Sequence, residues 1–191
     1  MTNTFNNSVH KAISTTGTQI YSGSNLDATG DVGIVIGMLV SNTGTSDTQI
    51  SAYHVGSANA ISSVTDSSGL LVTTSSPHGM VEGDSIVFTT TGSFPTNITA
   101  ETIFYVKYVN TTTFNIATAS GGTAVAFSAA GSNTSFHSAM PLINQVKIPT
   151  NTSLELCRGN KFVVKKDESL HALRTGGTAS TAMISILEIT S

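Results

Sequence analysis

Hydrophobic residues occur along this chain in short runs separated by polar turns, and almost nowhere at the spacing of a helix. The longest run, Val32–Val40, has the length of one buried strand. Thr, Val and Ile favour extended backbone because their branched side chains are restricted in a helix. Turns rich in Gly, Asn and Ser recur at roughly the 8–12-residue spacing typical of sandwiches and barrels. The pattern therefore predicts an all-β protein.

The two ends of the chain together supply the strands of one sandwich. Three strands are predicted in the first third and five in the last, and neither group alone is enough for two sheets. In the final strand, Ile184 and Ile186 share one face while Met183 and Leu187 lie on the other. We therefore expect an antiparallel, jelly-roll-like β-sandwich built from both chain ends, with these strands: Thr18–Tyr21, Val32–Ser41, Thr48–Val55, Leu142–Ile148, Ser153–Leu156, Lys161–Val164, Ser169–Leu173 and Ala182–Ile189.

The middle of the chain differs from the two ends in composition, and it predicts a separate small β-barrel. It holds six of the eight Phe residues and several Gly- and Pro-containing turns. Because insertion at an exposed loop is well tolerated, we expect a discontinuous sandwich of residues 1–59 and 137–191 with a barrel of residues 60–136 inserted in it. The predicted barrel strands are Leu70–Thr74, Ser85–Thr89, Ile103–Val109, Thr113–Ala117 and Ala124–Ser128.

Composition narrows the classes of function. The 191 residues include 30 Thr and 26 Ser, only 10% are charged, and the net charge is −3. Nucleic-acid binding is disfavoured because it needs clustered Lys and Arg in excess. No apolar stretch approaches the roughly 18 residues of a membrane span. The first residues lack the basic start and apolar core of a secretory signal, and Cys157 is the single cysteine, so we expect synthesis in a reducing cytoplasm.

Candidate chemistry is sparse. The five histidines, His10, His54, His78, His137 and His171, are scattered without metal-ligand spacing, and no nucleophile-elbow or phosphate-loop motif occurs. Glu82 with Asp84, and Asp167 with Glu168, form acid pairs in turns, where acids usually bond their own backbone. Cys157 is expected to be a buried apolar residue. We therefore expect no enzyme activity, no cofactor and no metal site; a hydrolase using an acid pair and a calcium-binding loop are the alternatives.

The middle region contains the stretch from His78 to Phe88, then Phe94-Pro95, and then the segments Ile103–Val109 and Thr113–Ala117. Together these segments resemble a small β-barrel module that recurs in virion proteins of tailed bacteriophages. The module is also likened to the first-catalytic-cysteine half-domain of ubiquitin-activating enzymes. The segment of this chain contains no Cys, so the resemblance implies no ubiquitin chemistry.

The flanking regions contain an early strand at Gly33–Asn42, Ile148-Pro149 leading to Ser153–Leu156, a hairpin around Asp167-Glu168, and a closing segment, Ile184–Ile189. This pattern resembles small sandwich proteins found among the structural genes of marine and cyanobacterial phages. Many of these proteins have Gly-Asp where this chain has Asp167-Glu168.

Together the resemblances imply a non-enzymatic virion structural protein of a tailed phage, made in the cytoplasm of the host bacterium. Among such roles we favour a capsid decoration, or cement, protein that binds the shell. The alternatives are a neck, collar, tail-adaptor or tail-fibre component, and an adhesin module that binds host glycans through the barrel loops. The expected partners are other virion proteins (the major capsid protein, or neck and tail proteins) and further copies of the chain as a trimer, with neither nucleic acid nor membrane. Candidate interaction residues, chosen because they cluster near one hairpin, are Lys161, Lys165, Lys166 and Arg174.

Overall fold

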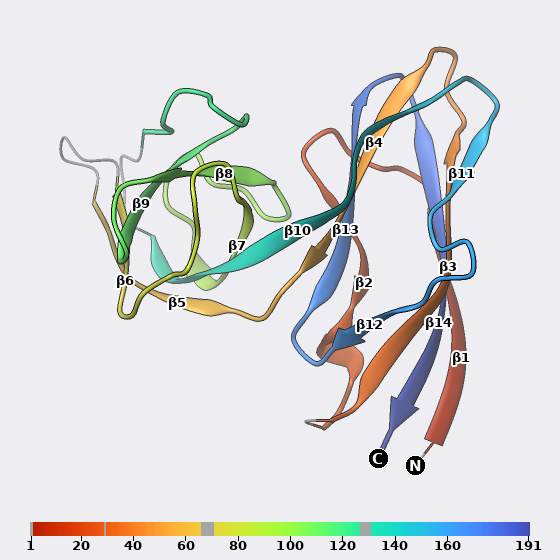
Figure 1. Ribbon diagram of the computed structural model, residues 1–191, viewed down its shortest axis with the longest axis horizontal. Coiled ribbons are helices and arrows are strands. Elements are labelled where there is room, and N and C mark those ends of the chain that lie inside the picture. Colours follow the sequence, from red (N-terminus) through yellow and green to blue (C-terminus); the bar gives the residue numbers. More distant parts are fainter. Residues whose placement is uncertain (1, 29, 66–70, 127–130) are drawn as a thin grey trace. The chain divides into compact units, whose positions relative to one another are not determined.

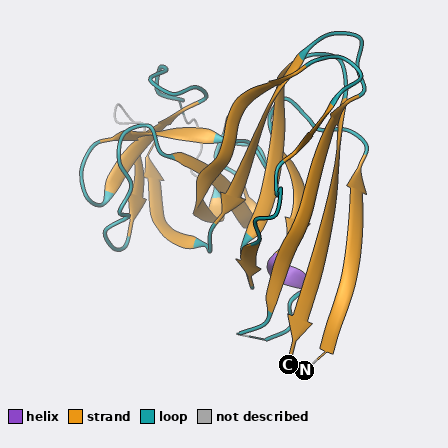
Figure 2. Ribbon diagram, turned by 45° about the vertical axis from the view of Figure 1, so that its right-hand side comes forward, coloured by secondary structure: helices purple, strands orange, loops and turns teal. Residues whose placement is uncertain are grey.

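The computed structural model confirms an all-β protein. It describes residues 2–28, 30–65, 71–126 and 131–191, in which fourteen strands are joined by loops and by one 3-10 turn, η1 (Gly23–Asn25) (Figure 2). The described chain forms two compact units. Residues 1–54 and 141–191 make the first unit, a sandwich, and residues 55–140 make the second, a barrel.

The sandwich contains a sheet, called sheet A here, that includes both ends of the chain. All of its pairings are antiparallel, and β3 lies against three other strands. The termini lie side by side because β1 pairs with β14 from Thr2↔Thr190 to His10↔Ala182 (Figure 1). The strands of sheet A are β1 (Thr2–His10), β14 (Ser180–Thr190), β3 (Val32–Asn42), β11 (Ser153–Glu155) and β12 (Phe162–Lys165).

A second sheet, sheet B, closes the other side of the sandwich. Its strands, in order, are β2 (Thr18–Ser22), β13 (Ser169–Gly176), β4 (Thr48–Val55) and the part of β10 (Ser132–Ile148) that begins at Pro141. Alternate residues of both sheets meet in one core that removes their apolar surface from water. That core contains Val35, Met38, Ile184 and Ile186 from sheet A, and Ile20, Ile50, Leu170 and Ala172 from sheet B.

The inserted unit is a closed barrel of six strands. Its strand order is β10-β5-β6-β9-β8-β7, and β7 pairs in turn with the first half of β10, so that the ring has no free end. Its core holds four fully buried phenylalanines, Phe88, Phe104, Phe114 and Phe136. The remaining strands are β5 (Asn59–Thr65), β6 (Leu71–Thr74), β7 (Ser85–Ser93), β8 (Phe104–Tyr108) and β9 (Thr113–Ala117).

The unit boundaries lie outside those expected from the sequence. The barrel begins at residue 55 and ends at residue 140, rather than at residues 60 and 136. The second boundary falls within β10, a single strand of 17 residues. Because backbone and composition are continuous there, no turn signal marks the point where the chain leaves the barrel.

Two strands are absent from the sequence-based prediction, and one predicted strand is wrong where it is described. β1 has only Phe5 and Val9 as apolar residues, and β5 has few more, so neither shows the alternation of a half-buried strand. In the predicted strand Ala124–Ser128, the described residues form only a single bridge, Ala117↔Ala124. The rest of that strand, and Leu70 of another, lie outside the described residues.

Candidate functional site

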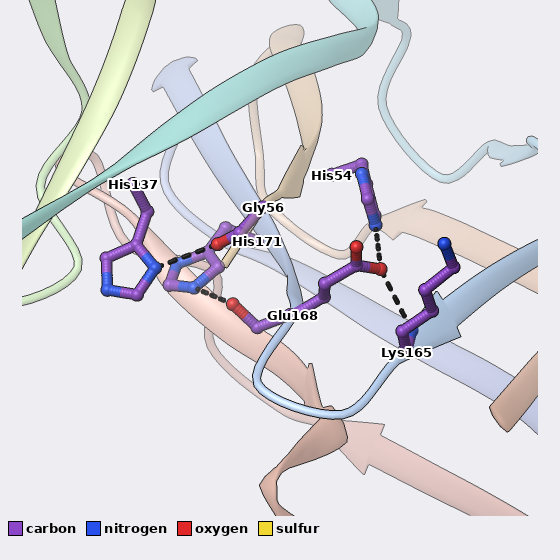
Figure 3. Close-up of polar contacts among 7 residues, drawn as sticks. His54, Gly56, His137, Lys165, Glu168 and His171 are labelled. Atoms are coloured by element: carbon purple, nitrogen blue, oxygen red, sulfur yellow. Dashed lines mark hydrogen bonds and ion pairs between the residues drawn. The ribbon is translucent and has the colours of Figure 1, made fainter. Parts of the chain in front are cut away.

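The turn between β12 and β13 is held by polar side-chain contacts to its neighbours. Nε2 of His54, on β4, lies 3.0 Å from Oε2 of Glu168, and that oxygen also accepts a hydrogen bond of 2.9 Å from the backbone N–H of Lys165 (Figure 3). Nε2 of His171 lies 3.0 Å from the hydroxyl of Ser169. Glu168 therefore ties the turn to β4, which is a structural use of the second acid pair.

The two histidines of the barrel, His78 and His137, are also held by local contacts. In the barrel, Nδ1 of His137 lies 2.8 Å from the Gly56 carbonyl and its Nε2 lies 2.8 Å from the Thr89 hydroxyl. A carbonyl oxygen only accepts, so Nδ1 of His137 carries a proton and donates to Gly56. Nδ1 of His78 accepts from the Met80 N–H at 3.0 Å, so its Nε2 donates to the Asn110 carbonyl at 2.7 Å. These imidazoles fix loops and strands of the barrel.

The first acid pair and the cysteine also have local structural surroundings. Oδ2 of Asp84 accepts a hydrogen bond of 2.8 Å from the Val81 N–H, and Glu82 lies 3.7 Å from Nζ of Lys107. Cys157 is buried in the sandwich core, as expected, and burial followed by the charge of Glu155 raises the pKa of its thiol. Over the described ranges, no group of three His, Cys, Asp or Glu side chains is placed to hold a metal ion.

The four basic residues chosen from the sequence do not form one cluster. Lys165 and Lys166 lie at the β12–β13 turn. Lys161 precedes β12, about 13 Å from Lys165 by the rise of a strand, and Arg174 lies about 17 Å along β13 from Ser169. Lys166 donates to the Asp27 carbonyl at 2.9 Å. Arg174 donates to the carbonyls of Ile13, Gly176 and Gly177 at 2.8 to 2.9 Å. Arg174 therefore holds two loops of the sandwich together.

The outer face of sheet A, the face turned away from the core, carries two apolar rows that cross the sheet. Paired residues of antiparallel strands point to the same side, so the register places them. The first row runs Phe5–Leu187–Ile34–Val163. The second runs Val9–Met183–Leu39 and ends at Glu155 of β11. Phe5, Val9, Val163 and Met183 are 62%, 59%, 46% and 43% exposed, so about half of each side chain is in water.

Small residues separate the two rows. Asn7, Ser185 and Gly37 are paired across the same three strands. A shallow hollow of about 220 Å³ opens here, with Gly37, Leu39 and Met183 among its lining residues. A further row, Asn3–Ile189–Val32, ends at Lys165. The two charged side chains that the register places on this face, Glu155 and Lys165, both lie on the β11 and β12 side, and the remainder of the face is uncharged.

A polar cleft lies beside this face, at the side where both sheets end. It has a volume of about 350 Å³ and lies between β1, β2 and β14. At its wall the Tyr21 hydroxyl donates to Oε1 of Glu188 at 3.0 Å, and Asn6 Nδ2 donates to Oε2 at 2.6 Å. Burial first, and then the hydrogen bond to Glu188 and its charge, raise the pKa of Tyr21.

Tyr21 is expected to make the stability of the sandwich fall at alkaline pH. A raised pKa in the folded state means that its contribution is complete below the ordinary tyrosine pKa of about 10 and is lost as pH rises through the folded value. Tyr21→Phe should lower the free energy of unfolding at pH 8, and the gap to the wild type should shrink toward pH 11. Urea unfolding followed by circular dichroism at both pH values measures this. A constant gap would contradict the assignment.

Neither a known family model nor a curated protein matches this chain. Along the described ranges, no helix has the length and apolar character needed to cross a membrane.

Proposed function

We propose that this chain is a non-enzymatic structural protein of a tailed-phage virion, attached to the capsid shell as a decoration protein through the outer face of sheet A. The observation that carries the proposal is the pair of exposed apolar rows across that face. Exposed apolar patches of this kind mark sites of interaction with other proteins. The barrel segment and its flanks resemble phage virion proteins, and this resemblance supports a place for the chain in a phage virion.

The surface chemistry suits permanent contact with another protein. A charge that is desolvated at an interface costs free energy unless it is well paired. The outer face of sheet A places few charges in such a contact, because Glu155 and Lys165 lie toward one side of it. The histidines and the acid pairs form hydrogen bonds that hold loops and turns in place. This use of the side chains agrees with a structural role rather than a catalytic one.

Attachment to particles tests the proposal directly. Particles that lack the chain are mixed with purified protein, and the bound copies are counted by quantitative mass spectrometry after sedimentation. Val163→Glu, which puts a charge into the first apolar row, should reduce occupancy at least tenfold. Val81→Glu is the matched control, because Val81 is 62% exposed but belongs to the barrel.

The copy number separates the structural roles. Occupancy in the hundreds per particle fits a decoration protein, whereas about a dozen copies fits a neck or collar ring and contradicts decoration. Loss of attachment with Val81→Glu, and not with Val163→Glu, would contradict the face assigned here and place attachment on the barrel.

A further inference from the structure

Strand β1 has an unusual environment for the edge of a sheet. It pairs along all nine residues with β14 and without any register shift, and in the described sheet its other edge has no partner strand. No residue of β1 belongs to the buried core. An edge of nine residues offers about 30 Å of unpaired backbone donors and acceptors.

β1 lacks the features by which proteins protect such edges. Charged residues, proline, bulges and short length all discourage pairing with another strand. The sequence from Thr2 to His10 contains no Asp, Glu, Lys, Arg or Pro, and its pairing shows no bulge.

The other edges of the sandwich are protected. β11 and β12 have three and four residues and carry Glu155 and Lys165. β2 has five residues and a register shift against β13. The sandwich part of β10 is the last strand of sheet B. There Pro141 interrupts the edge and Lys147 adds a charge to it. β1 therefore differs from every other edge of the described sandwich.

We propose that β1 pairs edge to edge, in antiparallel orientation, with β1 of a second copy of this chain, forming a two-fold symmetric dimer. In this proposal the dimer is the unit that assembles into the virion. The inference therefore rests on the proposed function. A two-fold interface uses the same patch on both copies. A ring such as the trimer expected from the sequence would need a different, complementary edge, and the other edges of the sandwich are protected.

The residues of β1 suit pairing with themselves. With the two-fold axis at Asn6, Phe5 faces Asn7 of the second copy. The two Phe5 residues become diagonal neighbours with their Cα atoms about 7–8 Å apart, within reach of an aromatic side chain. No like charges meet, because β1 carries none. The row Phe5–Leu187–Ile34–Val163 then lies diagonally next to the same row of the second copy, displaced by two residues, so that the two outer faces adjoin.

Sedimentation of the full chain over a range of concentrations tests the dimer. Asn7 is exposed, and Asn7→Lys brings two positive charges together next to the axis, so the dimer dissociation constant should rise at least tenfold. Asn160→Lys adds the same charge in an exposed loop and should leave that constant unchanged. A wild-type monomer at every concentration, a trimer, or a dimer unaffected by Asn7→Lys would overturn the proposal.

Cysteine cross-linking tests the orientation separately. A disulfide forms only when the two Cα atoms lie within about 7 Å. With the axis at Asn6, Asn6→Cys should therefore cross-link to itself, while Thr2→Cys, whose two copies lie about 27 Å apart in antiparallel pairing, should not. Efficient cross-linking of Thr2→Cys would overturn the antiparallel arrangement.

The two proposals fail independently. A chain that is monomeric in solution but still attaches to particles removes the dimer and leaves the proposed function standing. A chain that forms the dimer but never attaches to particles removes the proposed function and leaves the dimer standing.

Discussion

Phe114→Ala is expected to remove about 3–5 kcal/mol from the stability of the barrel while leaving the sandwich folded. Phe114 is fully buried on β9, and its ring meets Phe136 edge to face with centroids 5.3 Å apart and His78 at 5.2 Å. Truncation loses the transfer free energy of the ring and leaves a cavity among rigid neighbours. A barrel of 86 residues, from 55 to 140, has little stability to spare.

Hydrogen exchange read by peptide mass spectrometry measures both units in one experiment. Peptides from β6 to β9 should exchange much faster in Phe114→Ala, whereas peptides from β3 and β14 should keep their protection. Val81→Ala, at an exposed position of the same unit, is the control and should change neither. Equal loss of protection in both units would show that the barrel is not an independent cooperative unit.

Gly23→Ala is expected to destabilise the sandwich by about 3 kcal/mol, at the upper end of the cost of forcing extra atoms into packed structure. Gly23 opens η1 and packs against the β12–β13 turn, where its N–H donates to the Glu168 carbonyl at 2.8 Å. A Cβ at this position would overlap the Lys165 carbonyl oxygen and lie 2.9 Å from that of Glu168. Both obstacles are backbone, so the turn or η1 must shift.

Gly37→Ala supplies the matched control for this prediction. A Cβ at Gly37 would meet nothing nearer than Ser185 Cβ at 3.9 Å, so the same substitution should be close to neutral. Urea unfolding followed by circular dichroism compares the two variants. If Gly23→Ala is as stable as Gly37→Ala, the packing of η1 against the turn is not as described.

The alternation within single strands predicts the fold well. In β14 the sequence separates Ile184 and Ile186 from Met183 and Leu187, and the structure buries the first pair in the core while Met183 is 43% exposed. β1 shows the limit of this reasoning. Its residues stay largely exposed in the sandwich, so no hydrophobic period marks it, and only its pairing with the last strand of the chain makes it a strand.

The candidate site depends on the pairing of strands that are far apart in the sequence, and the sequence alone does not show which strands pair. Phe5, Leu187, Ile34 and Val163 come from four distant segments, and they become one row only when β1, β14, β3 and β12 pair. A signal was nevertheless present, because β3 and β14 are apolar on both faces in a chain with few charges. Arg174 is grouped with the hairpin lysines because it lies close to them in the sequence, and the sequence does not indicate that its guanidinium donates to carbonyls of its own unit.

Electron cryomicroscopy of the assembled particle tests the central claim most directly, since it would show which surface of this chain meets its neighbours. We predict density for many copies on the capsid shell, with the outer face of sheet A buried against another protein and Phe5, Val163 and Met183 inside that contact. Particles that carry no copy of the chain, or copies whose sheet A faces solvent on its outer side, would contradict the account.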